Sequence, residues 1–249
     1  IKVDKNVIPM AGGIVGYTTQ PVTVEGCVNK ANVSVHLTNT NAFHVGGIVG
    51  KNGVNTNTVK EGVQVYDCTN EGDISGYTET TESTGGWLYV GGCFGSCYGG
   101  ASSDALPAAW GTVGCVADGC VNKGKVRALG GAKFRVGGIS GLLNRSDIIN
   151  CTNEGTVTNE RTPLYKEEFF GGIVGFAENG SYGNISGCTN SGVVAYLMPT
   201  RSGTGEKTVA NNYHATIGGI LGRAKDALTK VTNCTFTGKV LGTNDKTHT

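Results

Sequence analysis

The sequence is poor in charge, in proline and in aromatic residues. Only 16% of its 249 residues are charged, the formal net charge is +1, and the chain has 5 prolines. Because the charges balance and no basic stretch occurs, we expect no nucleic-acid partner. Little charge and little proline also argue against disorder, and the Gly-X-Y period of collagen is missing.

The chain also lacks long apolar runs and known catalytic motifs. No run approaches the roughly 18 apolar residues of a membrane span, so we expect no membrane insertion of this segment. The chain opens Ile-Lys-Val-Asp, without an initiator Met or a signal peptide, which predicts a soluble fragment or mature form. It has no Gly-x-Ser-x-Gly elbow, His-Glu-x-x-His motif or P-loop. We therefore predict that it is not an enzyme and needs no cofactor.

Glycine, by contrast, is abundant: the chain has 42, more than twice the usual share of about 7%. Many of them belong to a signature of two glycines, two mostly apolar residues and a third glycine. The six copies begin at Gly12, Gly46, Gly91, Gly137, Gly171 and Gly218. A dinucleotide-binding loop is rejected for these copies because the helix that a phosphate site requires is missing.

A second signature, Cys-x-Asn-x-Gly-x-Val, follows each copy of the first. Its cysteines are Cys27, Cys68, Cys120, Cys151, Cys188 and Cys234. The asparagine two residues later is Asn29, Asn70, Asn122, Asn153 or Asn190, and Phe236 replaces it in the last copy. Four residues after the cysteine stands glycine, except for Ala31 in the first copy.

The two signatures together predict an all-β parallel β-helix, or β-solenoid, of about six rungs with loop insertions. The apolar runs are short and β-branched, and no helical period is sustained. A unit of about thirty residues with two or three strands cannot bury its own apolar face, so the units must stack. We treat residues 1–249 as a single solenoid domain, a fragment of a larger surface protein.

Stacking turns each recurring residue into a column with a spacing of about 4.8 Å. The cysteines are expected to form a buried column of mostly free thiols, and the asparagines a hydrogen-bonded structural ladder. The glycine after each asparagine would supply either a positive φ or a close approach between strands. An exposed terminal rung would be an open sheet edge, which makes end-to-end association plausible.

Three further cysteines, Cys93, Cys97 and Cys115, cluster in the third repeat. Unpaired thiols are the first expectation, a Cys97–Cys115 disulfide is the second, and a zinc site the third, although we predict no bound metal. His36 and His44 flank a turn without a matching carboxylate pattern, which predicts surface histidines.

Function on a solenoid usually lies in its insertions. Four are expected, over residues 51–63, 77–88, 96–114 and 196–212. Aromatic rings there offer stacking platforms to sugars or proteins. The candidate binding residues are Trp87, Trp110, Tyr98 and Arg201; alternatively, each ring packs its own loop onto the solenoid.

The residues from Gly137 to Gly141 and from Asn150 to Val157 give the sequence a family likeness. It resembles the GLUG-type repeat of bacterial surface proteins, over nearly the whole chain. The resemblance implies a secreted or cell-surface location in a long modular protein, where such repeats flank other domains. It says little about the ligand, and the long insertions, Ala31 and Phe236 depart from the pattern.

Our leading hypothesis is a noncatalytic bacterial cell-surface module that acts as a stalk or adhesin. Its partners would be host or microbial glycans or surface proteins. The alternative is a carbohydrate-active enzyme, a lyase or hydrolase, on a right-handed β-helix, which needs converging carboxylates. Asp67, Asp118 and Asp147 stand at different offsets from the cysteine column and do not align as such a site. An ice-binding solenoid would need a more regular threonine lattice than this one.

Overall fold

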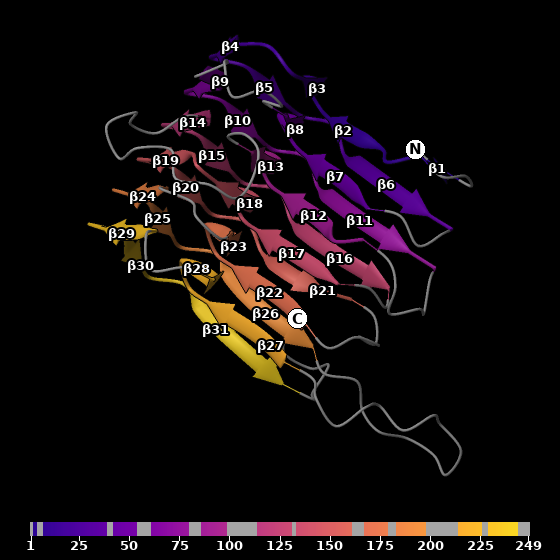
Figure 1. Cartoon of the computed structure of the whole chain (residues 1–249). Helices are drawn as coiled ribbons and strands as arrows, with labels where there is room; N and C mark the ends of the chain where they lie inside the picture. Colours follow the sequence, from indigo (N-terminus) through magenta and orange to yellow (C-terminus); the bar gives the residue numbers. More distant parts are fainter. Residues whose placement is uncertain are drawn as a thin grey trace.

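The computed structural model confirms the predicted fold class: a parallel β-solenoid of six rungs (Figure 1). It describes residues 2–3, 7–38, 42–53, 61–79, 86–98, 114–130, 133–160, 167–178, 183–197, 214–225 and 229–243. All the regular structure in these ranges is strand. Each rung has five strands rather than the two or three expected, and equivalent strands pair in parallel into five sheets.

The sheets are numbered here in the order in which one rung visits them. Sheet 1 contains β2 (Met10–Gly12), β7 (Phe43–Gly46), β12 (Leu88–Gly91), β17 (Phe134–Gly137), β22 (Glu167–Gly171) and β27 (His214–Gly218). Sheet 2 contains β3 (Val15–Thr18), β8 (Val49–Asn52), β13 (Phe94–Tyr98), β18 (Ser140–Asn144), β23 (Val174–Ala177) and β28 (Leu221–Ala224). The Gly-Gly turn joins sheet 1 to sheet 2 in every rung.

The other three sheets complete the rung. Sheet 3 contains β4 (Val22–Glu25), β9 (Glu61–Tyr66), β14 (Gly114–Asp118), β19 (Asp147–Ile149), β24 (Asn184–Ser186) and β29 (Lys230–Thr232). Sheet 4 contains β5 (Val28–Asn29), β10 (Thr69–Asn70), β15 (Val121–Asn122), β20 (Thr152–Asn153), β25 (Thr189–Asn190) and β30 (Thr235–Phe236). Sheet 5 contains β1 (Lys2–Val3), β6 (Val33–Leu37), β11 (Ile74–Thr78), β16 (Val126–Gly130), β21 (Val157–Asn159), β26 (Val193–Leu197) and β31 (Lys239–Thr243).

The expected insertions are shorter than the sequence indicated, because strands extend into them. Ser96 to Tyr98 belong to β13, and Ser96 and Cys97 are fully buried. Tyr196 belongs to β26 and is buried in the core rather than exposed in a loop. The strands therefore extend beyond the apolar runs from which the bounds of the insertions were predicted.

The interior holds two separate apolar cores. One lies between sheets 1 and 5 and includes Phe43, Ile74 and Phe134, and the other lies along sheets 2 and 3 with the cysteine column. Asparagine side chains from sheet 4 reach the Gly-Gly turn between sheets 1 and 2: a Cβ on Gly47 would lie 2.3 Å from Cγ of Asn70. This contact couples the two sequence signatures of one rung and separates the cores.

The asparagines form a continuous hydrogen-bonded ladder. The Nδ2 of each asparagine from Asn29 to Asn153 donates to Oδ1 of the next, at 2.7 to 2.8 Å. Each of these Nδ2 atoms also donates to the carbonyl two residues later, at 2.7 to 2.9 Å. Asn190 donates instead to the carbonyl of Gly219, at 2.8 Å, so the ladder ends before Phe236.

The glycine after each asparagine is required by close approach, not by a positive φ. A Cβ on Gly124 would lie 1.9 Å from the carbonyl oxygen of Gly72 on the preceding rung, and the equivalent distances elsewhere are 1.9 to 2.1 Å. Ala31, two residues after β5, is the exception because β5 is the edge strand of sheet 4 in the described part of the chain. Its methyl group therefore meets no neighbouring carbonyl.

A position that the sequence analysis missed does need a positive φ. The residue immediately before each cysteine of the column has φ between 50° and 67°. Left-handed backbone favours glycine, asparagine and aspartate, and the column contains only these. Its members are Gly26, Asp67, Gly119, Asn150, Gly187 and Asn233. Because every copy has glycine, asparagine or aspartate at this position, a turn with positive φ could have been predicted here from the sequence.

One buried residue contradicts the apolar pattern of the core. Glu168 precedes Phe169 in β22, points inward and is 2% exposed. The Tyr196 hydroxyl donates a hydrogen bond to its carboxyl group, and Oε2 has no partner within the described part of the chain. Burial raises the pKa of Glu168 to about 8, although the bond from Tyr196 acts in the opposite direction.

Candidate binding surface

Sheets 1 and 2 approach closely at the corner that the Gly-Gly turn forms. A Cβ on Gly141, the third glycine of its signature, would lie 2.8 Å from the backbone nitrogen of Val90. One on Gly175 would lie 2.6 Å from that of Val136. The third glycine thus brings sheet 2 against the sheet 1 strand of the preceding rung. Side chains that point away from the cores on the two sheets consequently meet.

An apolar cluster fills this corner, outside the two cores. Its centre is Leu142, Phe169 and Phe176, which are 1% to 3% exposed. Trp87, Tyr89 and Tyr98 are partly buried and pack against it. The Phe169 and Phe176 rings stack at 5.0 Å, and Trp87 stacks on Phe169 at 5.7 Å. We call these six residues the aromatic corner.

A buried arginine lies within the aromatic corner. The guanidinium carbon of Arg135 is 4.1 Å from the Trp87 ring centre and 3.9 Å from that of Phe176. Both distances are in the range of cation–π contacts. Arg135 is 4% exposed and pairs with Glu178 at 3.8 Å. Burial lowers the pKa of Arg135 from its ordinary value, while the Tyr89 and Glu178 charges oppose this change.

Glu178 gives the corner an oriented acidic edge. Asn144 donates from Nδ2 to its Oε2 at 3.0 Å, and Arg135 lies on the other carboxylate oxygen, Oε1. The Glu178 side chain is 33% exposed, so solvent still reaches it. Burial raises the pKa of nearby Tyr98, and the Glu178 charge raises it further. The corner thus combines partly exposed rings with a hydrogen-bond acceptor held in place.

The two histidines differ in burial, and the expectation that His44 lies at the surface is wrong. His44 is 5% exposed, stacks on Tyr89 at 4.6 Å and shares a 2.9 Å hydrogen bond between Nδ1 and the Ser96 hydroxyl. Burial lowers the pKa of His44, and the Lys51 charge lowers it further. His36 is partly exposed and contacts Glu79 at 2.8 Å.

The structure brings two of the four predicted binding residues to the same place. Trp87 and Tyr98 both belong to the aromatic corner, whereas Trp110 and Arg201 lie outside the described residues. The sequence analysis missed Arg135, Phe169 and Glu178. The first two could have been found by aligning the residues two positions before each double glycine. That column reads Met10, His44, Tyr89, Arg135, Phe169 and Thr216.

All nine cysteines are free thiols, so the Cys97–Cys115 disulfide is not formed. In the column, Cys151 donates from Sγ to the carbonyls of Ala117 and Ile149, at 3.5 and 3.1 Å. Burial raises the pKa of Cys68 to about 11, partly offset by a hydrogen bond from the Cys27 backbone. No group of three potential metal ligands occurs in the described ranges.

The fold and its repeated signatures define a parallel β-solenoid repeat protein, and one of its rungs is similar to a known repeat. The family model of the GLUG motif matches residues 134–158, which extend from β17 into β21 and make one rung. The motif indicates a bacterial repeat module. No curated protein and no solved structure gave a significant match to the chain. None of the described residues forms a helix long and apolar enough to cross a membrane.

Proposed function

We propose that this chain is a noncatalytic module of a bacterial cell-surface protein that binds a carbohydrate through the aromatic corner. The observation that carries the proposal is the concentration of rings around Arg135 on one outer corner of the stack. Apolar clusters on an outer surface often mark interaction sites. A GLUG rung with residues 134–158 supports the surface location.

The geometry favours a sugar because it offers both kinds of contact that a sugar ring uses. Trp87 and Tyr98 are partly exposed and present rigid rings that can pack on the C–H face of a sugar. Glu178, held by Asn144 and Arg135, can accept hydrogen bonds from sugar hydroxyl groups. Because the rings are already packed in place, little side-chain freedom is lost on binding.

The test is glycan-array binding by the purified chain, followed by calorimetry with the best glycan. Trp87→Ala is expected to weaken binding by about tenfold or more, because a central aromatic anchor is removed. Tyr17→Ala is the matched control: Tyr17 is an exposed ring of sheet 2 on the first rung, in register with Lys51. This variant should bind like the unaltered chain.

Two results would contradict the proposal. Equal affinity of Trp87→Ala and the unaltered chain, with both folded by circular dichroism, would remove the aromatic corner from the site. Reproducible cleavage of a polysaccharide, seen as new reducing ends or unsaturated products, would favour the carbohydrate-active enzyme instead.

A further inference from the structure

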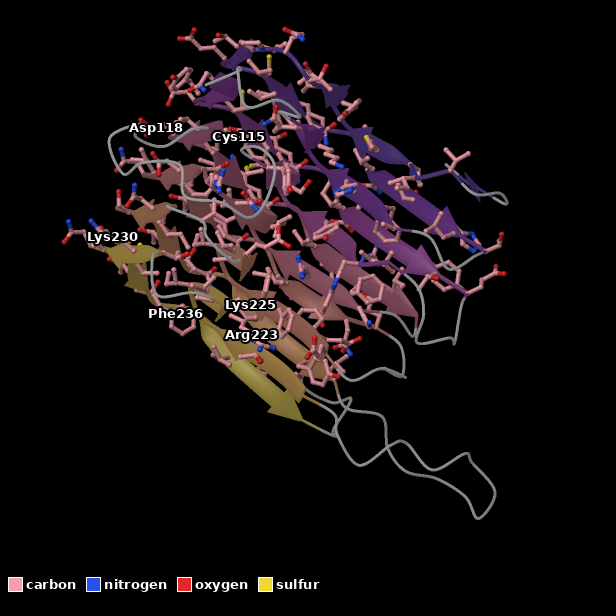
Figure 2. The ribbon with its side chains drawn as sticks, viewed as in Figure 1. Cys115, Asp118, Arg223, Lys225, Lys230 and Phe236 are labelled. Carbon is pink, nitrogen blue, oxygen red and sulfur yellow. The ribbon has the colours of Figure 1, made fainter. Side chains whose placement is uncertain are left out.

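The described residues around the aromatic corner carry more positive than negative charge. The cations lie in, or directly beside, strands of sheets 1 and 2, and they are Lys51, Lys133, Arg135, Arg223 and Lys225. Figure 2 shows Arg223 and Lys225 close together on the last rung. The carboxylates on the same outer surface are Glu167, which begins β22, and Glu178, which follows β23. Because the whole chain has a net charge of only +1, this excess is local.

Both carboxylates already have an arginine partner. Glu167 pairs with Arg223 at 3.9 Å, and Glu178 pairs with Arg135 at 3.8 Å. The guanidinium carbon of Arg223 also lies 5.0 Å from the ring centre of Phe169. The arginines therefore have counter-charges, and the excess of positive charge belongs to the lysines.

Lys51 is a half-buried lysine without an ion pair among the described residues. In sheet 2 it lies beside Ser96, which in turn lies beside Leu142 of the aromatic corner. Burial lowers the pKa of Lys51, and no carboxylate of the described residues opposes this effect. An anion bound beside this ammonium group would stabilise its charged form.

Lys133 is the second lysine of this kind. It is partly buried, and its Nζ lies 5.5 Å from the ring centre of Trp87, within the range of a cation–π contact. Glu167 occupies the equivalent position on the next rung, but its carboxylate pairs with Arg223 instead. A sugar packed on Trp87 would thus bring its substituents within reach of an ammonium group that has no carboxylate partner in the described ranges.

The two lysines lie on either side of the exposed rings along the stack. Lys51 belongs to the rung before that of Trp87 and Tyr98, and Lys133 belongs to the rung after it. Two steps between strands separate them by about 10 Å along the stack. A ligand that covers the rings and reaches both lysines therefore needs more than one anionic group.

We propose that the aromatic corner binds an anionic polysaccharide, whose carboxylate or sulfate groups pair with Lys51 and Lys133 while a sugar ring packs on Trp87. This inference rests on the proposed function and narrows its class of ligand. The rings supply apolar contact to any sugar, whereas the lysines favour acidic chains over neutral ones. A neutral glycan would cover the same surface and leave both ammonium groups without a counter-charge.

The test compares acidic glycans with neutral counterparts of the same sugar sequence by calorimetry. Uronate oligosaccharides are measured beside their carboxyl-reduced forms, and sulfated oligosaccharides beside their desulfated forms, which distinguishes the two kinds of anion. The acidic member of a pair is expected to bind about tenfold or more tightly than the neutral one. Its affinity should also fall as the NaCl concentration is raised, because partly exposed charges are screened.

Lys51→Gln and Lys133→Gln should each weaken binding of the acidic member by about three- to tenfold. Neither variant should change the affinity for the neutral member. Lys30→Gln is the matched control, because it removes the same charge from an exposed position directly after β5, in sheet 4. It should bind the acidic member as the unaltered chain does.

Equal affinity for the acidic and the neutral member, with Trp87→Ala still weakening both, would overturn this inference and leave the proposed function in place. Lysine variants with unchanged affinity for the acidic member would also overturn it. Equally tight binding of polyglutamate would do so as well, since charge without a sugar would then suffice. If no glycan of either kind were bound, the proposed function itself would fail.

Discussion

Replacing Asn122 by leucine is expected to lower the free energy of unfolding by about 3 to 5 kcal/mol. Asn122 accepts from Nδ2 of Asn70 and donates to Oδ1 of Asn153 and the Gly124 carbonyl, at 2.8 to 2.9 Å. Leucine removes these bonds and leaves buried polar groups without partners. The ladder would then be interrupted in its middle.

The matched control is Asn29→Leu, on the first rung. Asn29 donates to Asn70 but receives no bond from another asparagine, because β5 is the edge strand of sheet 4 among the described residues. Its replacement should therefore cost clearly less than that of Asn122. Urea unfolding followed by circular dichroism measures both. If the two variants were equally stable, the ladder would not act as a connected network.

The contribution of Glu168 to the stability of the protein is expected to fall as the pH rises from 5 to 9, by about 4 kcal/mol, because its carboxyl group is buried. In the unfolded chain its carboxyl group loses its proton near the ordinary pKa of 4.5, whereas in the folded chain the pKa is about 8. Between these values the folded state binds more protons than the unfolded state. The stability that Glu168 contributes is therefore greatest below pH 4.5 and is lost as the pH approaches 8.

Glu168→Gln should abolish most of this pH dependence, since the amide can still accept a hydrogen bond from Tyr196 and carries no charge. Glu154→Gln, on an exposed position, is the control and should retain the slope. Urea midpoints measured at several pH values between 5 and 9 provide the comparison. A Glu168→Gln variant with the same pH profile as the unaltered chain would contradict the assignment.

The fold could be predicted because repetition makes its signal strong. Six copies of two signatures fix the number of rungs, and the asparagine ladder follows from one residue at one position. The number of strands per rung could not be predicted, since sheet 4 has only two residues per strand, too few for a visible alternation. Glu168 was missed because a core position is inferred from apolar residues, and a buried carboxyl group gives no such signal.

Only part of the proposed binding surface could be predicted from the sequence. Trp87 and Tyr98 were predicted as binding residues because they are aromatic and lie in or beside the expected insertions. They lie close together because glycines such as Gly141 and Gly175 let sheet 2 approach the sheet 1 strand of the preceding rung. The sequence gives no sign of this contact, because the two rungs are far apart along the chain. Arg135 resembles an ordinary exposed strand residue until the rings that cover it are known.

The column of turn residues that precede the cysteines also determines how the solenoid can change in length. Along the stack it alternates between glycine and a residue with a side chain: Gly26, Asp67, Gly119, Asn150, Gly187 and Asn233. Removal of the rung that contains Gly119 would bring Asp67 beneath Asn150, and the Asp67 carboxylate, whose Oδ1 lies 2.2 Å from the position of a Cβ on Gly119, would have to turn aside. Removal of two neighbouring rungs would keep the alternation. At this turn the repeat is therefore two rungs, although the repeat of the sequence signatures is one.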